Sequence, residues 1–560
     1  MDVLYPRLAA TDTVALPMGS YRYVIVGAGS AGCALANRLS EDPSIRVLLL
    51  EAGGSDRNIN IRIPVAFAKQ FRTDLDWRYM SEPEPSLIGR SIFLPRGRSL
   101  GGSSSMNAMI YMRGHRSVFD AWANERGAPG WSYADVLPYF KRSEGNERLG
   151  APYHNPAGPL SVVDPAWVSS VAEPFIASAG AMGVPRSDDF NGREQEGAGI
   201  VQVTQKRGRR WSCADAFLHP IRKERENLDV VTGTLAHRIL FEGDRAVGVD
   251  YERRGGRDTA RAEAEVLVCA GAYNSPQLLM LSGIGPADEL RSVGIEPRLD
   301  APHVGRHLAD HPMTTLTWET DEVDTLHDAT HPRYLAEYVL RRGRGKLTSN
   351  VGEVVAHTRV ATDGPAPDFQ FLSGGAYYFD NGFRTFPGSA FTIAPSFVGP
   401  RSEGSVRLRS ADPHAPPAIH LNWLSDPAEM EAMIAACRFA RELASSGPLG
   451  AIAGRNLDPG PGVASDEQLE AWIRAECQHT YHPACTCRMG AEGDGVLDPE
   501  LRVRGVDGLR VVDASALPSI TSGNTNAPVI MVAERAADLL LGRPLLSAED
   551  PAAQAAAVPA

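Results

Sequence analysis

Three glycines and one carboxylate near the N-terminus have the types and spacing of a dinucleotide-binding cradle. The sequence Gly-Ala-Gly-Ser-Ala-Gly begins at Gly27, directly after the strand-like segment Tyr23–Val26, and opens a helix-like stretch. The first glycine allows a tight turn, Gly29 lets backbone N–H groups approach a pyrophosphate, and Gly32 allows close packing of helix and strand. Glu51 ends a second apolar segment 19 residues after Gly32. A carboxylate there accepts hydrogen bonds from ribose hydroxyls, so we expect a bound dinucleotide.

Further small-residue segments point to a larger cofactor than the first cradle alone would hold. The loop Arg96–Ala108 is too rich in Gly and Ser for a packed helix, and Gly271–Gly285 follows a strand-like apolar run. Two more motifs follow, Tyr481-His482-Pro483 and Gly523–Pro528. With these four segments in this order, the chain resembles the glucose–methanol–choline (GMC) family of FAD-dependent oxidoreductases over nearly its whole length.

The resemblance implies oxidation of an alcohol, which needs a base for the hydroxyl proton, a donor beside the oxygen and a hydride aimed at flavin N5. His482 matches the family's active-site histidine, and histidine suits a base because its ordinary pKa lies near neutrality. Asn524 matches a position where members carry His or Asn. Alternatively, Asn524 and Asn526 cap the helix expected near Pro528, a role that is compatible with catalysis.

The resemblance also implies a set of FAD contacts. Asp513 and Ala514 would meet the ribityl and pyrophosphate region, the backbone of Ala236 would meet adenine, and Trp77 would lie near the flavin-facing loop. Met106 stands where some members carry a histidine bonded covalently to the flavin, so we expect non-covalent FAD. The full expected set is Gly27, Gly29, Ser30, Ala31, Gly32, Glu51, Ala52, Trp77, Arg96, Leu100, Gly102, Ser103, Asn107, Ala108, Met109, Ala236, Ala270, Gly271, Asp513, Ala514 and Asn526.

Composition narrows the possible partners and location. The net charge of −12 argues against a nucleic-acid-binding surface. Two basic stretches, Lys206–Arg210 and Arg341–Arg344, are interpreted as solvated loops. No apolar run is long enough for a membrane-spanning helix, and the N-terminus has no secretory apolar core. Seven cysteines, an odd and sparse set, favour reduced thiols, and we expect a cytoplasmic protein.

The predicted fold class is α/β, a Rossmann-like FAD-binding domain with a discontinuous substrate domain built on an antiparallel sheet with helices. The expected domains are an FAD-binding domain at 20–312, a substrate-binding domain at 313–476 and a return to the FAD domain at 477–545. Residues 145–199 are a candidate addition to the substrate region. The first twenty residues are expected to be a flexible lead, and 546–560 a disordered tail.

Alternating residues in the predicted substrate domain suggest a sheet with one exposed face. Asp368–Phe371 and Ser405–Arg409 have this period-two pattern, which is typical of half-buried antiparallel strands. Glu429–Ser445 has helical spacing of apolar residues and should lie across the sheet.

A metal site is not expected. His303, His307 and His311 recur at four-residue spacing, which would stack imidazoles on one helix face, but Gly305 and Pro312 argue against a continuous helix. The pair Cys485 and Cys487 lacks the second pair that a thiolate metal site needs and is interpreted as buried small residues.

The preferred substrate is a neutral primary alcohol, aliphatic or aromatic. Choline-oxidising members tend to carry a glutamate after the Asp-His-Pro or Asp-His-Leu motif, and this chain has Met313 there. The alternatives are choline oxidation, a fatty-acid photodecarboxylase or hydroxynitrile lyase-like use of the same fold, and FAD binding without catalysis. The presence of His482 argues against the photodecarboxylase and non-catalytic alternatives. The sequence leaves open whether O₂ or a quinone-type carrier accepts the electrons.

Overall fold

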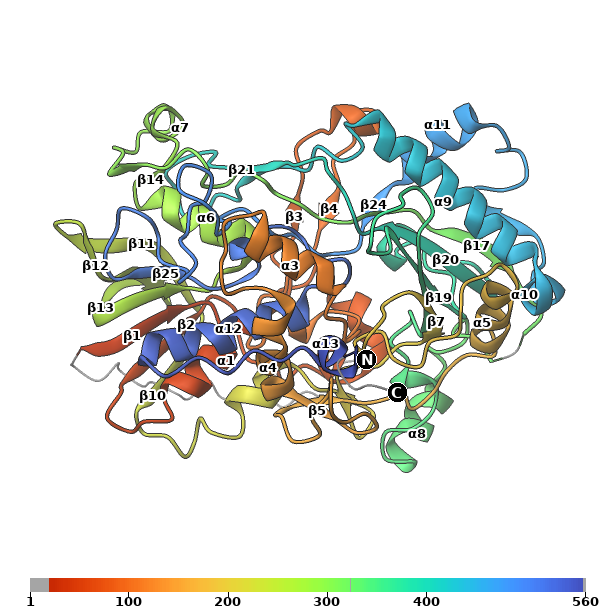
Figure 1. Cartoon of the computed structure of the whole chain (residues 1–560), viewed down its shortest axis with the longest axis horizontal. Helices are drawn as coiled ribbons and strands as arrows, with labels where there is room; N and C mark the ends of the chain where they lie inside the picture. The colour runs from red at the N-terminus through yellow and green to blue at the C-terminus, as the bar shows by residue number, and fades with distance from the viewer. Residues whose placement is uncertain (1–19, 323, 557–560) are drawn as a thin grey trace, which may run out of the picture.

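The computed structural model describes residues 20–322 and 324–556, and the flexible lead expected at the N-terminus lies outside this part but for residue 20. Two large sheets, side by side along the long axis, each form the centre of one half of the molecule (Figure 1). The mixed α/β architecture expected from the sequence is confirmed.

The first half is built on a mixed sheet whose central strands are parallel. The strand order is β10 (Leu228–Thr232), β2 (Val47–Glu51), β1 (Tyr21–Val26), β13 (Gly256–Val268), β12 (Arg245–Arg253) and β11 (Thr234–Glu242), with β25 (Leu509–Val511) also pairing with β13. Strand β13 pairs antiparallel with β12 through its first residues and parallel with β1 and β25 through its last. Continuous Val, Ile and Leu runs in β1 and β2 are buried on both faces, as parallel sheets require.

Helices from distant parts of the chain cover this sheet. Helix α1 (Ser30–Leu39) follows β1 and packs against α12 (Asn526–Leu541), which in turn contacts α4 (Tyr133–Ser143). Helix α6 (Gly271–Leu281) packs against β11. The other helices of this half are α2 (Ile59–Arg62), α3 (Arg116–Asn124) and α7 (Ala287–Ser292).

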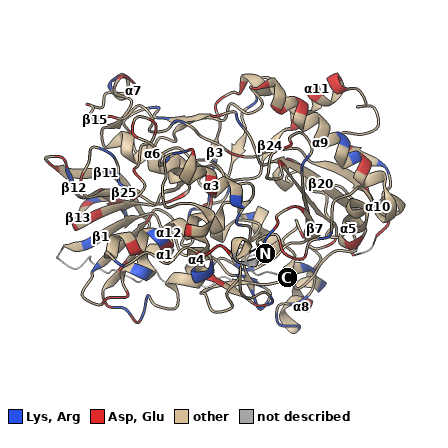
Figure 2. Ribbon diagram, in the orientation of Figure 1, with Lys and Arg blue, Asp and Glu red and all other residues tan. Residues whose placement is uncertain are grey.

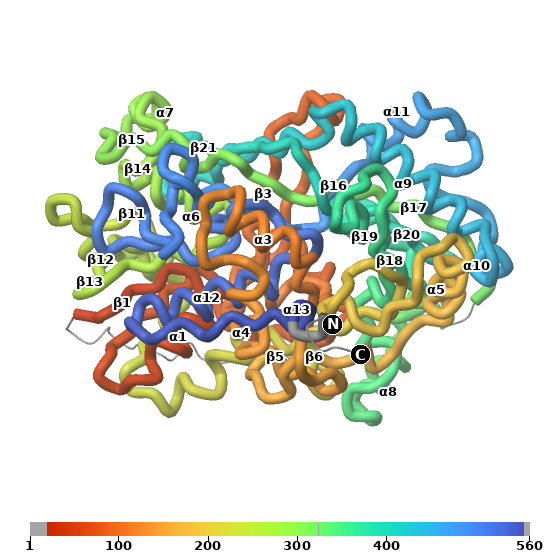
Figure 3. The backbone as a smooth tube through the Cα atoms, in the orientation of Figure 1, coloured from red at the N-terminus to blue at the C-terminus, as the bar shows by residue number. Residues whose placement is uncertain are grey.

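The second half is built on an antiparallel sheet. Its order is β23 (Asn456–Asp458), β17 (Leu316–Glu319), β20 (Ala390–Phe397), β19 (Phe369–Gly374), β18 (Val354–Thr358) and β7 (Gly197–Ile200). In addition, β16 (Pro312–Met313) pairs with β20, and β24 (Gln478–His479) pairs with β16. Strand β7 comes from the 145–199 segment and pairs with β18, and Figure 3 shows this part of the chain beside strands far along the sequence.

Helix α9 (Pro427–Ser445) lies against this sheet, where the sequence predicts a helix. Asp426 caps its first turn by accepting from the backbone N–H of Ala428, and Pro427 fits the first helical position because its missing N–H needs no partner there. The apolar side chains of α9 pack onto β20 and β17. The other helices of this half are α5 (Ala172–Ala181), α8 (Pro332–Leu340), α10 (Gly447–Ile452) and α11 (Asp466–Glu476).

The remaining elements are short. The strands are β3 (Tyr79–Met80), β4 (Phe93–Leu94), β5 (Glu144–Asn146), β6 (Leu160–Val162), β8 (Gln205–Lys206), β9 (Arg209–Arg210), β14 (Ile284–Gly285), β15 (Leu299–Asp300), β21 (Ser405–Arg407) and β22 (Ala418–His420). The 3₁₀ helices are η1 (Pro64–Gln70), η2 (Pro85–Leu87), η3 (Gly102–Ser105), η5 (Lys346–Thr348), η6 (Asp380–Gly382) and η7 (Ala514–Ala516), and η4 (Ala214–Leu218) is a π-helix.

The expectation of an exposed sheet face is wrong. Phe369, Gln370 and Phe371 in β19 are all fully buried, because helices cover one face and the other faces the interior of the molecule. The second alternating segment forms β21, which pairs with β22 in a separate two-stranded sheet.

The expectation of a disordered tail is wrong for the residues that the structure describes. The Leu546 backbone donates to the Tyr139 hydroxyl, and Glu549 and Asp550 form ion pairs with Lys141 and Arg116. A short helix, α13 (Pro551–Ala556), follows. These polar contacts order a segment whose composition alone predicts disorder. Residues 557–560 lie outside the described part of the chain.

Candidate active site

A cavity of about 620 Å³ lies between the two halves and receives side chains from both. Of the expected cofactor residues, all but Gly32 and Leu100 line it. For Gly32 this agrees with a packing role, but the Leu100 assignment differs from the structure. The Leu100 side chain is 2% exposed and belongs to the apolar core of the first half, and its backbone N–H donates to Gly54.

Backbone crowding explains the glycines of the first cradle. Gly27 has φ +102°, and a Cβ on Gly32 would lie 1.9 Å from the Gly27 carbonyl oxygen. A Cβ on Gly29 would meet nothing within 4 Å, because this glycine borders the open cavity. Helix α1 therefore begins at the cavity wall with no side chain capping its first N–H groups. Such a helix N-terminus is an anion site.

The second small-residue loop packs directly on the first. Gly102 has φ +53°, and a Cβ there would lie 2.7 Å from the Gly29 Cα. Nearby, the Gly97 N–H donates to the Ser103 hydroxyl, and Asn107 Oδ1 accepts from the Met109 backbone and from Arg210. The two loops together form one polar wall of the cavity.

Carboxylates mark two positions along this wall. Glu51 accepts from the backbone N–H groups of Ala28 and Gly53 at 2.9 and 2.8 Å, and burial raises its pKa to about 7. Asp513 accepts from the Gly271 backbone at 2.8 Å and from Ser275, and burial raises its pKa. These backbone contacts fix both carboxylates in place beside the cavity.

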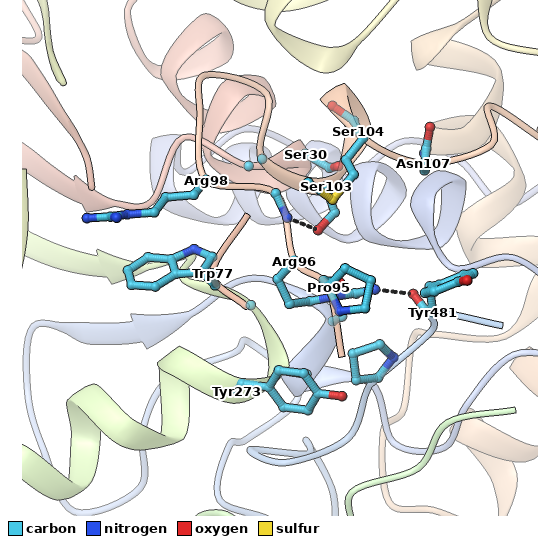
Figure 4. A pocket seen from close by; sticks show the side chains of 18 of the residues that line it. Ser30, Trp77, Pro95, Arg96, Arg98, Ser103, Ser104, Asn107, Tyr273 and Tyr481 are labelled. Carbon is cyan, nitrogen blue, oxygen red and sulfur yellow. Dashed lines mark hydrogen bonds between the residues drawn. The ribbon is translucent and has the colours of Figure 1, made fainter. Parts of the chain in front are cut away.

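Arg96, the first residue of the second loop, and Trp77 also line the cavity (Figure 4). The Arg96 guanidinium donates to the Tyr481 carbonyl oxygen at 2.8 Å. The Trp77 ring stacks on Tyr79 with centroids 5.8 Å apart, and the Arg98 guanidinium lies 4.9 Å from the Trp77 ring. At α12, Asn526 accepts from the Ser30 hydroxyl at 2.6 Å, which links this helix to α1.

His482 and Asn524 meet at the cavity. The Asn524 side-chain amide lies 3.0 Å from His482 Nε2, and its oxygen accepts from Gln370 at 3.2 Å. Because Gln370 donates to the amide oxygen, the Asn524 N–H points at the imidazole, and this bond places the lone pair of His482 on Nε2. The proton of the neutral ring then resides on Nδ1, which lies 3.0 Å from His311 Nδ1.

Burial keeps His482 neutral. Desolvation and the neighbouring His311 hold the pKa of His482 well below its ordinary value. Burial also lowers the pKa of His311, to about 4. A neutral imidazole whose Nε2 lone pair accepts only from a neutral amide N–H at the cavity can act as a proton acceptor.

Residues that the sequence did not mark as catalytic orient this histidine. Asp310 accepts from the His482 backbone N–H at 2.8 Å and lies 3.3 Å from His479 Nδ1. Although burial opposes its ionisation, the contact with His479 holds the pKa of Asp310 below its ordinary value. In the sequence, Asp310 and His311 stand out for the residue that follows them, and His311 also for its histidine spacing, whereas Gln370 carries no local functional signal.

Aromatic side chains form the wall next to His482. Phe67, Phe71, Tyr378 and Tyr481 line the cavity together with Met106. The two tyrosine hydroxyls lie 2.7 Å apart, and the Phe71 ring centroid lies 5.9 Å from that of Tyr481. This end of the cavity is therefore largely apolar.

The three histidines at four-residue spacing do not share one site. His303 and His307 face each other, with ring nitrogens 3.1 Å apart and Asp494 nearby, whereas His311 points to His482. Gly305, with φ +78°, breaks the helix between them. All seven cysteines are buried and unpaired.

Comparison with known families shows to which family the chain belongs. Residues 21–313 and 400–533 match the N-terminal and C-terminal family models described as GMC oxidoreductase. The chain belongs to the GMC oxidoreductase family. It is therefore an oxidoreductase, and the family resemblance drawn from the sequence is confirmed.

Relatives of this GMC oxidoreductase cover nearly its whole length. It is 45% identical to an uncharacterized GMC-type oxidoreductase of Mycobacterium tuberculosis (92% of this chain, 98% of the relative). It is 41% identical to mouse mitochondrial choline dehydrogenase (94% and 90%) and 41% identical to an acceptor-dependent alcohol dehydrogenase of Pseudomonas putida (93% and 96%). A solved structure of Aspergillus oryzae formate oxidase, in a study of FAD modification, superposes with a TM-score of 0.89 at 27% identity (94% and 99%).

The cavity of this GMC oxidoreductase suits the cofactor of its structural neighbours. FAD needs an anion site for its pyrophosphate and an acceptor for its ribose hydroxyls. The uncapped α1 N-terminus and the buried Glu51 supply these in order along one wall. Gly29, where a Cβ would meet open space, leaves the backbone accessible to the pyrophosphate.

Proposed function

We propose that this protein oxidises a neutral primary alcohol to its aldehyde with non-covalently bound FAD. The observation that carries the proposal is the His482–Asn524 pair, whose lone pair and N–H meet beside an apolar end of the cavity. When bound, FAD accepts the hydride at its N5 position. The assigned cofactor and catalytic residues are those named from the sequence, with the exception of Leu100.

Each residue near His482 has a separate role in the oxidation of the alcohol. His482 Nε2 accepts the hydroxyl proton, and the Asn524 N–H donates to the oxygen as negative charge develops there. The resulting imidazolium is stabilised by the buried carboxylate of Asp310, which accepts from the His482 backbone. Gln370 fixes the orientation of the Asn524 amide. Tyr378, Tyr481 and the phenylalanines exclude water from the reacting carbon.

Charge in the cavity favours a neutral substrate. Among the described residues, the carboxylates that line the cavity are Glu51 and Asp513, which belong to the cofactor wall. Met313 also lines it, whereas Glu353 is enclosed and accepts from the Ser169 backbone and the Ser349 hydroxyl. A quaternary ammonium would therefore enter without a carboxylate to offset its desolvation.

Anaerobic reduction of the bound flavin tests this proposal. The purified protein should be yellow, and acid precipitation should release all of its FAD because Met106 forms no covalent link. Benzylic or medium-chain primary alcohols should bleach the flavin in stopped flow, and subsequent mixing with O₂ or a soluble quinone would identify the electron acceptor. Flavin left in the pellet would contradict non-covalent binding, and a flavin that no alcohol reduces would contradict the proposed reaction.

Choline is the second candidate, because aromatic side chains can hold a trimethylammonium group through cation–π contacts. Phe67, Phe71, Tyr378 and Tyr481 are aromatic side chains that line the cavity next to His482, and choline dehydrogenase is among the relatives. Comparing choline with its uncharged isostere 3,3-dimethylbutanol separates the two candidates. We expect kcat/KM to favour the neutral alcohol by about a hundredfold, or about 3 kcal/mol. A preference for choline would make the aromatic wall a cation site.

A cytoplasmic location remains a prediction. Among the described residues, no helix has the length and apolar character needed to cross a membrane.

A further inference from the structure

Helix α8 exposes its apolar side chains. Leu335, Val339 and Leu340 are 45%, 65% and 82% exposed, and Ala336 is exposed as well. Tyr338 points inward, where its hydroxyl donates to the Gly208 carbonyl oxygen. At 100° per residue the four exposed side chains form one continuous face. A surface helix usually buries its apolar face, whereas this helix exposes it.

Four arginines lie on two segments next to this helix. Arg342 and Arg344 follow α8 directly, and Arg207 and Arg209 lie on the β8–β9 hairpin. The hairpin and the α8 segment are in tight contact, since a Cβ on Gly208 would lie 1.8 Å from the Gly343 carbonyl oxygen. Figure 2 marks basic residues at the end of α8, which projects from the edge of the molecule.

The four arginines differ from the neighbouring Arg333 and Arg341 in their ion pairs. Arg341 pairs with Glu337, and Arg333 pairs with Asp328. In the parts of the chain that the structure describes, no ion pair involves Arg207, Arg209, Arg342 or Arg344, which are all exposed. The four arginines therefore form a local excess of positive charge in a chain whose net charge is −12. The basic side chains of the two stretches, interpreted from the sequence as solvated loops, are exposed except at Arg210, and the structure brings the two stretches together.

We propose that α8 and these four arginines dock the protein on a lipid membrane that carries anionic headgroups. Apolar side chains on a short helix can enter the boundary of the acyl chains while the helix lies in the membrane plane. Arginines beside them contact the headgroup phosphates and the negative surface potential. The combination of an exposed apolar face and nearby cations without ion pairs matches such a membrane, because the apolar side chains meet the acyl chains and the arginines meet the anionic headgroups.

The docking surface continues along the chain into the cavity. Arg341–Gly345 connects α8 to η5, and Asn350, Val351 and Gly352, shortly after η5, line the cavity. A docked molecule would thus hold this wall of the cavity near the lipid, where apolar alcohols and quinone-type electron acceptors dissolve. This consequence rests on the proposed function, whereas docking itself does not.

Flotation of the FAD-loaded, full-length protein with vesicles tests the proposal. We expect binding to vesicles of phosphatidylcholine with about one third phosphatidylglycerol, and at least about tenfold weaker binding to pure phosphatidylcholine. Val339→Glu/Leu340→Glu and, separately, Arg342→Glu/Arg344→Glu should each weaken binding to the anionic vesicles by at least about tenfold. Flavin reduction by a water-soluble alcohol should be unchanged in both variants, which shows that they fold.

Matched controls place the same chemical changes elsewhere. Ile88, 66% exposed, carries the apolar control Ile88→Glu, and the exposed Lys223 and Arg401 carry the charge control Lys223→Glu/Arg401→Glu. Both controls should float like the wild type. The proposal is overturned if the wild type stays with the soluble fraction, if the α8 variants bind as well as it does, or if the controls lose as much binding. Loss of self-association in the α8 variants without vesicle binding by the wild type would instead make this face a subunit interface.

Activity gives a second readout. Reduction of a long-chain quinone embedded in anionic vesicles should be at least about tenfold slower in Val339→Glu/Leu340→Glu than in Ile88→Glu. If vesicle binding is lost and quinone reduction is unchanged, docking stands but its proposed link to the electron acceptor is wrong. If no alcohol reduces the flavin, the proposed function fails while flotation still reports on docking.

Discussion

The two ring nitrogens of His482 have different tasks. Nε2 shares the cavity with the Asn524 amide, and Nδ1 contacts His311. Because the amide oxygen of Asn524 is held by Gln370, the amide cannot turn and offer its oxygen to the imidazole without losing that bond. Chemistry at this site depends on which nitrogen carries the proton, and the hydrogen-bond network settles that choice.

Replacing His482 should stop proton transfer while leaving the cofactor bound. We expect His482→Ala to retain FAD and to reduce its flavin about two to four orders of magnitude more slowly with a primary alcohol, the usual contribution of a positioned base. Asn524→Ala should cost less, because it removes a donor and leaves the base. Anaerobic stopped flow measures both rates. A wild-type rate in His482→Ala would remove this histidine from the mechanism.

The low pKa of His482 sets the pH dependence. The active form is the neutral imidazole, and a lowered pKa means that it becomes protonated only at a pH below the ordinary histidine value. We therefore expect flavin reduction to be constant from about pH 8 down to about pH 6.5 and to fall only below that. The pH profile of kcat/KM measures this limb. An apparent pKa above 7 would show that the base is another group or that His482 is solvated.

At the scale of elements, the β1–α1 turn combines two kinds of glycine. Gly32 serves the fold, because a Cβ would collide with the Gly27 carbonyl oxygen 1.9 Å away. Gly29 has no such neighbour and borders the cavity. One turn thus uses glycine once for packing and once for access by the cofactor.

Alanine at these two positions should separate stability from cofactor binding. Gly29→Ala should leave the melting temperature of the apoprotein nearly unchanged and weaken FAD binding by at least about tenfold, because the methyl group enters the cofactor's space. Gly32→Ala should lower the melting temperature of the apoprotein itself. Thermal unfolding without FAD and titration with FAD distinguish the two. Equal apoprotein destabilisation by both would contradict the division of roles.

At the scale of the whole molecule, the catalytic pair depends on both halves. Asn524 precedes α12 of the first half, and Gln370, which holds its amide, lies on β19 of the antiparallel sheet. The packing of the two halves around the cavity therefore positions the reacting groups as well as the substrate.

Removing Gln370 should weaken catalysis without touching the base. We expect Gln370→Leu to slow flavin reduction about 3- to 10-fold, the value of one neutral hydrogen bond. The pH profile should keep its shape, because His482 is unchanged, and KM should change less than kcat. The variant Gln370→Met, which keeps a side chain of similar length but has no N–H, should resemble Gln370→Leu. A wild-type rate in both would show that Asn524 needs no support from the second half.

The sequence determined those features whose parts are close together in the chain. The strand–glycine–helix–carboxylate run from Tyr21 to Glu51 specifies a cofactor cradle because its geometry is local, and the apolar spacing of α9 specifies a helix for the same reason. The match at His482 and Asn524 relied on motifs of the same short kind, and the structure places both at the cavity.

Tertiary structure alone decided what surrounds these residues. Asp310, His311 and Gln370 reach the site from other strands and loops, so no local pattern shows that they contact His482 and Asn524. The alternation in β19 predicted an exposed face, but a second layer covers it, because burial depends on what packs against a strand and not on the strand's own sequence. Likewise, two basic stretches more than a hundred residues apart became one surface only when the chain folded them together around α8.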